Sequence, residues 1–236
     1  MTQSLTIVVT GAFGVLGTAV ARTLATTGAH VALVDVAKTP PPALQAEFAA
    51  QHRLVGAVDL TSLAAARDAF AAVAGHFGGI DALVNVAGGF QWQRVEDGEL
   101  EAWDSMYAMN LRTAVVGCKA VLPWLLERGR GRIVNIGAGA AARTAAAGMG
   151  AYTAAKTGVQ RLTESLAAEM RDRGVTVNAV LPGTIDTPRN RADMPDADTS
   201  RWVRPEQVAE VIRFLVSDAA DAVTGAAIPV FGRGWA

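Results

Sequence analysis

The hydrophobic residues of the chain fall into short runs that alternate with longer Ala-rich stretches. Seven runs are nearly continuous in apolar residues, as parallel strands buried on both faces require: 5–10, 30–36, 53–59, 80–87, 131–137, 175–181 and 226–231. Between them, apolar residues recur at helical spacing over 18–28, 61–78, 102–129 and 151–174. The alternation predicts an α/β fold, a doubly wound parallel sheet of about seven strands with helices on both faces.

The size of the chain sets its domain organisation. Its 236 residues, 51% of them hydrophobic, are enough for one compact domain spanning 1–236, and no repeat or second domain is visible. Pro40, Pro41 and Pro42 predict a loop after the second strand. The segment 188–204 is rich in Asp and Arg, too polar for a core, and is expected to form a mobile loop or lid over a substrate.

The net charge and the pattern of apolar residues argue against several classes of function. The net charge of −1 argues against nucleic-acid and acidic-lipid partners. A strand-like run begins almost at once and no apolar stretch reaches membrane-spanning length, so we expect a cytoplasmic protein without a membrane partner. The single cysteine, Cys118, lies in an apolar helical run and is expected to be a core thiol. His30, His52 and His76 show no ligand spacing, and no metal site is predicted.

A glycine-rich turn follows the first strand. The segment TGAFGVLG carries Gly11, Gly14 and Gly17 and opens directly into a helix. Glycines allow the backbone to approach a pyrophosphate closely, and the helix N-terminus offers unpaired N–H groups and a positive dipole end. Between a strand and a helix, this turn predicts a dinucleotide site. The backbone expected to line the pyrophosphate is that of Gly11, Phe13, Gly14, Val15, Leu16 and Gly17.

Acidic residues at two later strand ends indicate how the adenosine is held. Asp35 ends the second strand, 18 residues after Gly17, where a carboxylate accepts hydrogen bonds from ribose hydroxyls and repels a 2′-phosphate. NAD(H) is therefore expected in preference to NADP(H), although Lys38 lies nearby. Asp59, with Leu60 beside it, closes the third strand and could accept from the adenine amino group.

The segment after the fourth strand is the next candidate for cofactor contact. Its sequence is Asn85-Val86-Ala87-Gly88, and in a doubly wound sheet it would line the adenine side of the site. Alone, such a segment is an ordinary loop signal, so its value depends on its position. We expect Asn85, Ala87 and Gly88 to contact the cofactor.

Tyr152 and Lys156 are the candidate catalytic pair. Their spacing of four residues places both side chains on one face of a helix, where an ammonium beside a phenol favours the ionised phenol. Most tyrosine and lysine pairs at this spacing are ordinary surface neighbours. The dinucleotide motif upstream makes a catalytic role for this pair more plausible than an ordinary surface position. The pair therefore predicts proton transfer by Tyr152.

Taken together, these motifs resemble the short-chain dehydrogenase/reductase family across essentially the whole chain. The matching features are the Gly-rich turn, Asp59, Asn85 to Gly88, Asn110, Tyr152 with Lys156, and Pro182-Gly183 followed by Thr187. The resemblance implies a Rossmann-like domain and an NAD(P)-dependent oxidoreductase. It further implies roles for single residues: Tyr152 is the general acid/base, Lys156 holds the nicotinamide ribose and lowers the tyrosine pKa, and Asn110 supports a water-linked proton relay. Thr187, with the backbone near Ile185, would hold the nicotinamide carboxamide beside Pro182 and Gly183.

Two departures from the family pattern affect the expected chemistry. Val15 stands where the family places its second glycine, and Gly14 takes over that role. The family serine that donates to the substrate oxygen after the fifth strand is missing, and Ala138 occupies its region, with Thr144 as the nearest hydroxyl. The quinonoid dihydropteridine reductase branch also lacks a hydroxyl there, and the segments VAGGF, GMGAYTAAK and VLPGTIDTPRNRADMPDADTSRW are similar to it.

Several substrates and one non-enzymatic role remain open at this point. The leading hypothesis is NADH-dependent hydride transfer to a small carbonyl or quinonoid, dihydropteridine-like substrate. Alternatives are a 3-oxoacyl-thioester or other ketone reductase, an alcohol dehydrogenase, and a nucleotide-sensing protein without catalysis. The pocket residues expected to touch a small-molecule substrate are Phe90, Trp92, Ala138, Met149 and Trp202.

The resemblance also implies an assembly. In this family the helices that carry Asn110 and Tyr152 commonly pair between subunits. A small-residue face at Ala154, Ala155 and Ala168 would allow two helices to approach closely. A homodimer or homotetramer is therefore expected.

Overall fold

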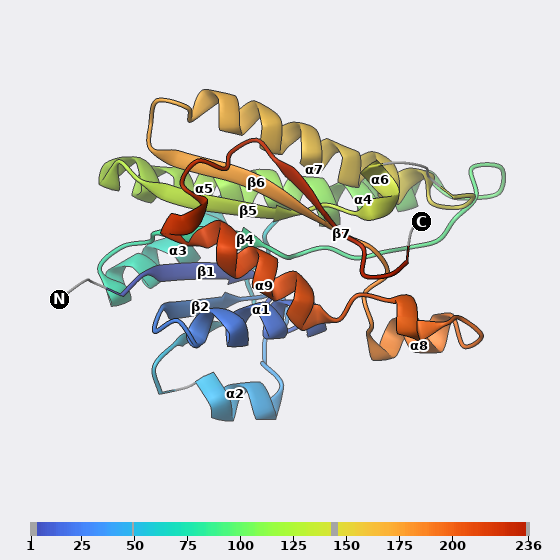
Figure 1. Ribbon diagram of the computed structural model, residues 1–236, viewed down its shortest axis with the longest axis horizontal. Coiled ribbons are helices and arrows are strands. Elements are labelled where there is room, and N and C mark those ends of the chain that lie inside the picture. The colour runs from blue at the N-terminus through green and yellow to red at the C-terminus, as the bar shows by residue number, and fades with distance from the viewer. Residues whose placement is uncertain (1–3, 49, 143–145, 235–236) are drawn as a thin grey trace.

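The computed structural model describes residues 4–48, 50–142 and 146–234, and its centre is a seven-stranded parallel sheet (Figure 1). The spatial order is β3-β2-β1-β4-β5-β6-β7, with every pair of neighbours parallel. The strands are β1 (Thr6–Thr10), β2 (His30–Val34), β3 (Arg53–Val55), β4 (Ala82–Asn85), β5 (Gly131–Ile136), β6 (Val175–Pro182) and β7 (Ala227–Val230). The predicted fold class is confirmed, and each of the seven predicted runs corresponds to one of these strands, with β6 ending one residue beyond its run.

Helices cover both faces of the sheet. One hydrophobic cluster joins strand residues such as Ile7 and Val9 to α1, α2 and α9. A second joins Val8 and Leu83 to α3, α5 and α7. The alternation along β1 shows why its run is apolar throughout, since successive side chains point to opposite, covered faces. The helices are α1 (Val15–Ala25), α2 (Pro42–Phe48), α3 (Leu63–Phe77), α4 (Leu100–Met106), α5 (Thr113–Arg128), α6 (Gly139–Ala142), α7 (Gly150–Glu169), α8 (Pro188–Asp193) and α9 (Pro205–Val216).

The stretch 102–129, predicted as one helix, is divided by a π-helical turn. Helix α4 passes into a π-helix at Tyr107–Arg112, which continues into α5. In a π-helix each backbone hydrogen bond spans five residues instead of the four of an α-helix. The extra residue changes the direction in which the following side chains point from the helix axis. Such insertions are frequent at functional sites, and this one carries Asn110.

Three other boundaries differ from the prediction. Pro42 is the first residue of α2, so the predicted proline loop ends at Pro41. Strand β3 stops at Val55, because the backbone turns at Gly56 and at Ala57, whose φ is +59°. The segment 188–204 contains α8 and a 3₁₀ turn, Thr199–Arg201, and none of the residues in these two elements is buried. Its polarity is as predicted; its mobility stays a prediction.

Three further predictions from the sequence concern the single cysteine, membrane-spanning helices and the histidines. Cys118 is buried, and burial raises the pKa of its thiol to about 12, so the core-thiol prediction is confirmed. Within the described ranges, no helix combines the length and apolar character needed to cross a membrane. The three histidines lie far apart in sequence but gather in one pocket, and no group of three or more metal-ligating side chains is found among the described residues.

Candidate active site

The crevice of the sheet lies where the strand order reverses. Strand β1 pairs with β2 on one side and with β4 on the other, so the connections leave in opposite directions at this point. Ligands of open α/β sheets bind outside the carboxyl ends of the strands at such a switch point. The ends of β1, β4, β5 and β6 therefore bring the predicted motifs to one edge, and α8 lies beyond the same edge (Figure 1).

The glycine turn is packed too closely for side chains at two of its positions. Gly11 has a φ of +61°, and a Cβ there would lie 2.7 Å from the Cα of Ala87. A Cβ on Gly17 would lie 2.6 Å from the Cα of Ala12, so Gly17 lets α1 pack against the turn. Gly14 differs, because the nearest atom to its Cβ position is 3.5 Å away.

Helix α1 begins with unpaired donors. Its first intrahelical hydrogen bond runs from the Thr18 N–H to the Gly14 carbonyl, at 2.9 Å, and Gly14 at the N-cap has no side chain to cap the turn. The N–H groups of Val15, Leu16 and Gly17 therefore face the crevice end of the helix without intrahelical acceptors. This arrangement fits a pyrophosphate, which supplies anionic acceptors to such donors.

Asp35 lies directly after β2 and is 8% exposed. Its Oδ2 accepts the Phe13 N–H at 2.9 Å, and its Oδ1 accepts the Ala37 N–H at 2.9 Å. The carboxylate thus ties the glycine turn to the end of β2, a role the sequence did not reveal. A carboxylate has about four acceptor positions, so two remain for ribose hydroxyls.

The predicted adenine contacts divide into exposed and buried residues. Asp59 is exposed and lies past the end of β3, where its Oδ1 accepts from the backbone and hydroxyl of Thr61; these bonds lower the pKa of the carboxyl. Leu60 is buried in the core. Asn85 is also buried, and its amide donates to Asn135 Oδ1 at 2.9 Å. Its side chain is therefore engaged in the core, and contact of Asn85 with the cofactor stays a prediction.

A polar network under the crevice went unnoticed in the sequence. Asn135 Nδ2 donates to Thr163 Oγ1 at 2.9 Å, and the Thr163 hydroxyl donates to the Val159 carbonyl, so β4, β5 and α7 are linked through Asn85, Asn135 and Thr163. Thr10 at the end of β1 accepts the N–H groups of Val86 and Ala87. The only sequence signal was a polar residue inside an apolar strand run.

Asn110, Lys156 and Gly88 come together at the centre of the crevice. A Cβ on Gly88 would lie 2.7 Å from Asn110 Oδ1 and 3.2 Å from Lys156 Nζ, so no larger residue fits between them. The Asn110 amide accepts the Gly89 N–H at 3.1 Å and donates to the Gly89 carbonyl at 3.0 Å. The side chain of Asn110 clamps the loop after β4, and the π turn places it there.

The pKa values of the catalytic pair differ from the expectation. Burial lowers the pKa of Lys156 to about 8, while its Nζ donates to the Ile136 carbonyl at 2.8 Å. Burial raises the pKa of Tyr152 to about 12. Without a bound cofactor, desolvation therefore raises the Tyr152 pKa by more than the predicted effect of Lys156 lowers it. The Tyr152 phenol is protonated at neutral pH. Tyr152 also meets the edge of Phe90, with ring centroids 5.1 Å apart.

The segment after β6 supplies a second wall. Gly183 N–H donates to the Val230 carbonyl and continues the pairing of β6, through Pro182, with β7. Thr187 caps α8, since its Oγ1 accepts the Asn190 N–H at 3.1 Å, and the Asn190 amide donates to the Ile185 carbonyl at 2.7 Å. Asn190 thus fixes the segment predicted to hold the carboxamide, a role the sequence did not indicate.

The structure places some of the predicted substrate residues beside one another. Phe90 contacts Tyr152, while Trp92 donates to the Ala147 carbonyl at 3.0 Å, just before Met149 at the start of α7. The Trp202 carbonyl is 3.2 Å from the Cβ position of Gly232, and contact of Trp202 with a substrate stays a prediction. Ala138 is buried and offers no donor, and Thr144 lies outside the described residues.

The fold and the crevice define a dinucleotide-binding protein with a tyrosine and a lysine at the switch point. The sequence matches the short chain dehydrogenase family over residues 5–198. It is 33% identical to D-beta-hydroxybutyrate dehydrogenase of Rhizobium meliloti, covering 98% of each chain, and 38% identical to D-threitol dehydrogenase of Mycolicibacterium smegmatis, covering 95% of this chain and 90% of that one. It is 35% identical to 2-(S)-hydroxypropyl-CoM dehydrogenase 3 of Xanthobacter autotrophicus, covering 96% and 94%.

The chain belongs to the short-chain dehydrogenase/reductase family and is an oxidoreductase. The family uses NAD(P)(H) and acts on hydroxyl and carbonyl groups of small molecules.

Proposed function

We propose that the protein is an NADH-dependent reductase in which Tyr152 supplies the proton that accompanies hydride transfer. The observation that carries the proposal is the packing of Gly88, Asn110 and Lys156 at the switch point, with Tyr152 one helical turn from Lys156. NADH, when bound, supplies the hydride. The protein orients the reacting groups and donates the proton.

The protonation state of Tyr152 allows it to act as the proton donor of a reduction. Because the Tyr152 pKa is about 12, the phenol carries its proton throughout the neutral range and can donate it to a reduced substrate. Lys156, with a pKa of about 8, keeps its ammonium below that pH and directs one N–H to the Ile136 carbonyl. Its remaining donors are available to the nicotinamide ribose, and Thr187 with the Ile185 backbone would hold the carboxamide.

The preference for NADH over NADPH rests on Asp35. Two backbone N–H groups fix its carboxylate beside the glycine turn, so it cannot move away from a 2′-phosphate. A 2′-phosphate placed beside this carboxylate, which is itself buried, would be repelled by a like charge. Lys38 is exposed on the following loop and does not pair with Asp35 in the described structure.

We propose a conjugated, electron-poor acceptor such as a quinonoid dihydropteridine as the substrate. Ala138 provides no hydroxyl for a developing alkoxide, and one such donor is typically worth about 3 kcal/mol in the transition state. A quinonoid ring spreads the incoming charge and depends less on that donor. The edge of Phe90 against Tyr152 supplies an apolar surface for a flat ring.

A second candidate is interconversion of a simple alcohol and its ketone. The names of the relatives favour it, since they are dehydrogenases of hydroxybutyrate, threitol and hydroxypropyl-CoM. This reaction, like reduction of a 3-oxoacyl thioester, would need a donor from water or from the substrate itself in place of the missing serine.

We further propose that the protein is a homodimer or homotetramer. Leu100, Trp103 and Tyr107 form an exposed apolar stripe on α4 and the π turn, at the spacing of one helical face. Ala154 and Ala168 are exposed on α7, as the pairing requires, whereas Ala155 is buried against the core and is removed from the predicted face.

The test follows NADH absorbance with a quinonoid dihydropteridine, a simple ketone and a 3-oxoacyl thioester, and NAD⁺ with secondary alcohols. We expect the quinonoid compound to have the highest kcat/KM. The Tyr152→Phe variant should lose about 10²–10⁴ of the rate while its NADH affinity changes little. Binding of NADH without turnover of any acceptor would instead support the nucleotide-sensing alternative and contradict the proposal.

A further inference from the structure

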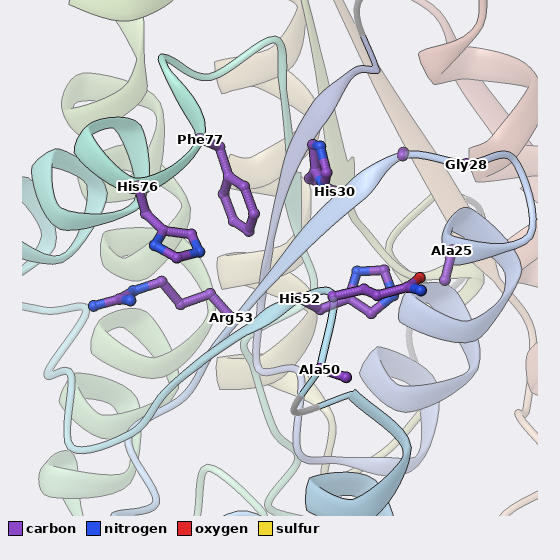
Figure 2. Close-up of a pocket in the computed structure, with 10 residues that line it drawn as sticks. Ala25, Gly28, His30, Ala50, His52, Arg53, His76 and Phe77 are labelled. Atoms are coloured by element: carbon purple, nitrogen blue, oxygen red, sulfur yellow. The ribbon is translucent and has the colours of Figure 1, made fainter.

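A second pocket lies at the opposite edge of the sheet, where the strands begin (Figure 2). Its volume is about 500 Å³, within the range of small-molecule sites. We call it the histidine pocket and define it by His30, His52, Arg53, His76 and Phe77. These residues come from the start of β2, the start of β3 with the residue before it, and the end of α3. They include all three histidines of the chain.

Arg53 is a cation with no partner among the residues that the structure describes. Its Nε is buried and has no hydrogen bond, and no ion pair joins its guanidinium to any described residue. Buried polar groups in proteins are nearly always hydrogen-bonded, so an N–H group of this kind calls for an acceptor. A guanidinium presents several N–H groups in one plane and matches the oxygens of a phosphate or carboxylate.

The imidazoles add further donors. His52 Nδ1 accepts the Val31 N–H at 3.2 Å, so the proton of the neutral ring is on Nε2. Burial and the neighbouring His30 lower the pKa of His52. His30 stacks on Phe77, with centroids 4.8 Å apart, and His76 meets the edge of the same ring at 4.5 Å. Phe77 thereby fixes two imidazoles, whose nitrogens make no described hydrogen bond.

No acidic residue lines the pocket to neutralise these groups. On the flanking helices α1 and α2, Arg22 and Glu47 pair with each other at 2.8 Å. Asp81, just before β4, is held by Arg128 at 2.9 Å. Asp68 is exposed on α3, two turns before His76. The pocket therefore carries the permanent positive charge of Arg53, which no acidic side chain among its described lining residues neutralises.

We propose that the histidine pocket binds a small phosphate monoester, whose phosphate group accepts from Arg53 and from His76, which lies on the same side of the pocket as the Arg53 side chain (Figure 2). A phosphate offers three oxygens to such donors, and it carries nearly two negative charges at neutral pH. The volume leaves room for an organic group of sugar size beside the phosphate. This site is separate from the crevice, because β2 enters the pocket with His30 and reaches the crevice with Asp35.

The chain offers a direct readout of this pocket. Because its only histidines line it, the histidine ring proton signals in the NMR spectrum of untagged protein report on this site alone. The probe is glucose 6-phosphate at pH 6, with glucose and inorganic phosphate as separate arms and with NADH present to fill the crevice. We expect the monoester to shift the signals saturably, and glucose to leave them unchanged.

The Arg53→Gln variant should weaken binding by about tenfold, and Arg53→Lys should restore part of it. His76 is exposed at the end of α3, so His76→Gln should fold normally and weaken binding of the monoester. The matched control is Arg67→Gln, which removes a charge from the same helix outside the pocket.

Two results would overturn the proposal. One is the absence of any saturable shift of the histidine signals by glucose 6-phosphate at pH 6. The other is unchanged affinity in both Arg53→Gln and His76→Gln. Inorganic phosphate that bound as tightly as the monoester would overturn the assignment of the organic group.

Discussion

At the scale of single residues, burial shifts the pKa values of the candidate catalytic pair, Tyr152 and Lys156. Lys156 is almost fully buried without a carboxylate partner, and its pKa falls from an ordinary 10.5 to about 8. Tyr152 is partly buried, and its pKa moves in the opposite direction, to about 12, because its charged form is the anion. Both shifts favour neutral side chains, so the pair is adjusted by desolvation more than by mutual attraction.

Lys156 is therefore expected to lower the stability of the native fold at neutral pH. Below pH 8 the amine is charged in both folded and unfolded chains, and burial of this charge costs about 3 kcal/mol. The Lys156→Met variant removes that cost and loses one hydrogen bond, worth about 1 kcal/mol, to Ile136. We expect its free energy of unfolding at pH 7 to rise by about 2 kcal/mol while turnover disappears, measured by urea denaturation and NADH oxidation.

The pH dependence provides the control. Between pH 8 and about 10.5 the unfolded lysine binds more protons than the folded one, so the stability of the native protein rises relative to the variant. Above this window the advantage of Lys156→Met should be gone. Lys119→Met, at an exposed site on α5, should show no such trend. A stability gap that is constant with pH would contradict the account.

Asp35 is expected to determine the choice of cofactor. The Asp35→Asn variant keeps one acceptor oxygen for the backbone but loses the charge that repels a 2′-phosphate. We expect the ratio of kcat/KM for NADPH over NADH to rise by about tenfold or more. Asp59→Asn, at the exposed adenine side, should leave this ratio unchanged. An NADPH preference in the native enzyme would exclude the assignment.

Ala138 is expected to limit the substrates. Introducing Ala138→Ser adds a hydroxyl after β5, where a developing alkoxide would accept from it. We expect kcat/KM for a simple ketone to rise by about 10–10² and that for a quinonoid acceptor to change little. The two substrates are compared in both proteins by NADH oxidation. Efficient reduction of simple ketones by the native enzyme would show that another group replaces the serine.

At the scale of elements, the strands were predictable because a strand covered on both faces is apolar along its whole length, as β1 is. Helix α9 was missed although Val208, Ile212 and Leu215 recur on one of its faces, so here the signal was present. The π turn was not predicted, because the inserted residue shifts the hydrophobic period by a single position and the apolar residues on both sides still fit one helix.

The candidate site was also predictable from the sequence only in part. Its motif residues follow strand ends, and parallel strands bring those ends together whatever the loops do. The supporting residues were beyond reach, because their partners are distant in sequence: Asn135 bonds Asn85 and Thr163, and Thr10 bonds the loop at Val86. The three histidines of the pocket could not be grouped from the sequence for the same reason, because they are distant from one another along the chain.

Two glycines of the same turn should respond differently to alanine. Gly17→Ala forces a Cβ to 2.6 Å from the Cα of Ala12, so α1 must move, and we expect a loss of about 1–3 kcal/mol of stability. In Gly14→Ala the nearest atom to the new Cβ, the Gly11 carbonyl oxygen, is 3.5 Å away, so the variant should fold as the native protein does. Its methyl group should weaken NADH binding. Thermal denaturation and NADH titration of both variants test this, and equal stability would contradict it.

At the scale of the whole molecule, the sheet separates two sites at opposite ends of its strands. The crevice lies at the carboxyl ends, and the histidine pocket lies at the amino ends of β2 and β3. The five residues of β2 span roughly 17 Å, so both sites can be filled at once. A third surface, the exposed stripe on α4, lies on the face covered by α5 and α7, away from α1 and α9.

That stripe is expected to hold subunits together. Trp103 is 39% exposed, and Trp103→Glu would place a charge in an apolar interface. We expect this variant to sediment as a monomer under conditions where the native protein is a dimer or tetramer. Met194→Glu changes a residue of equal exposure at the end of α8 and should leave the assembly intact. A native protein that sediments as a monomer would disprove the assembly.

The isolation of Cys118 has a practical consequence for watching this enzyme move. The chain has one thiol, it is buried, and its pKa of about 12 keeps it protonated and unreactive. The native sequence thus already behaves as a cysteine-free background for maleimide dyes and nitroxide spin labels. A cysteine placed at exposed Met194 on the segment 188–204 would take a single label, and its spectrum would report whether that segment changes position when NADH binds.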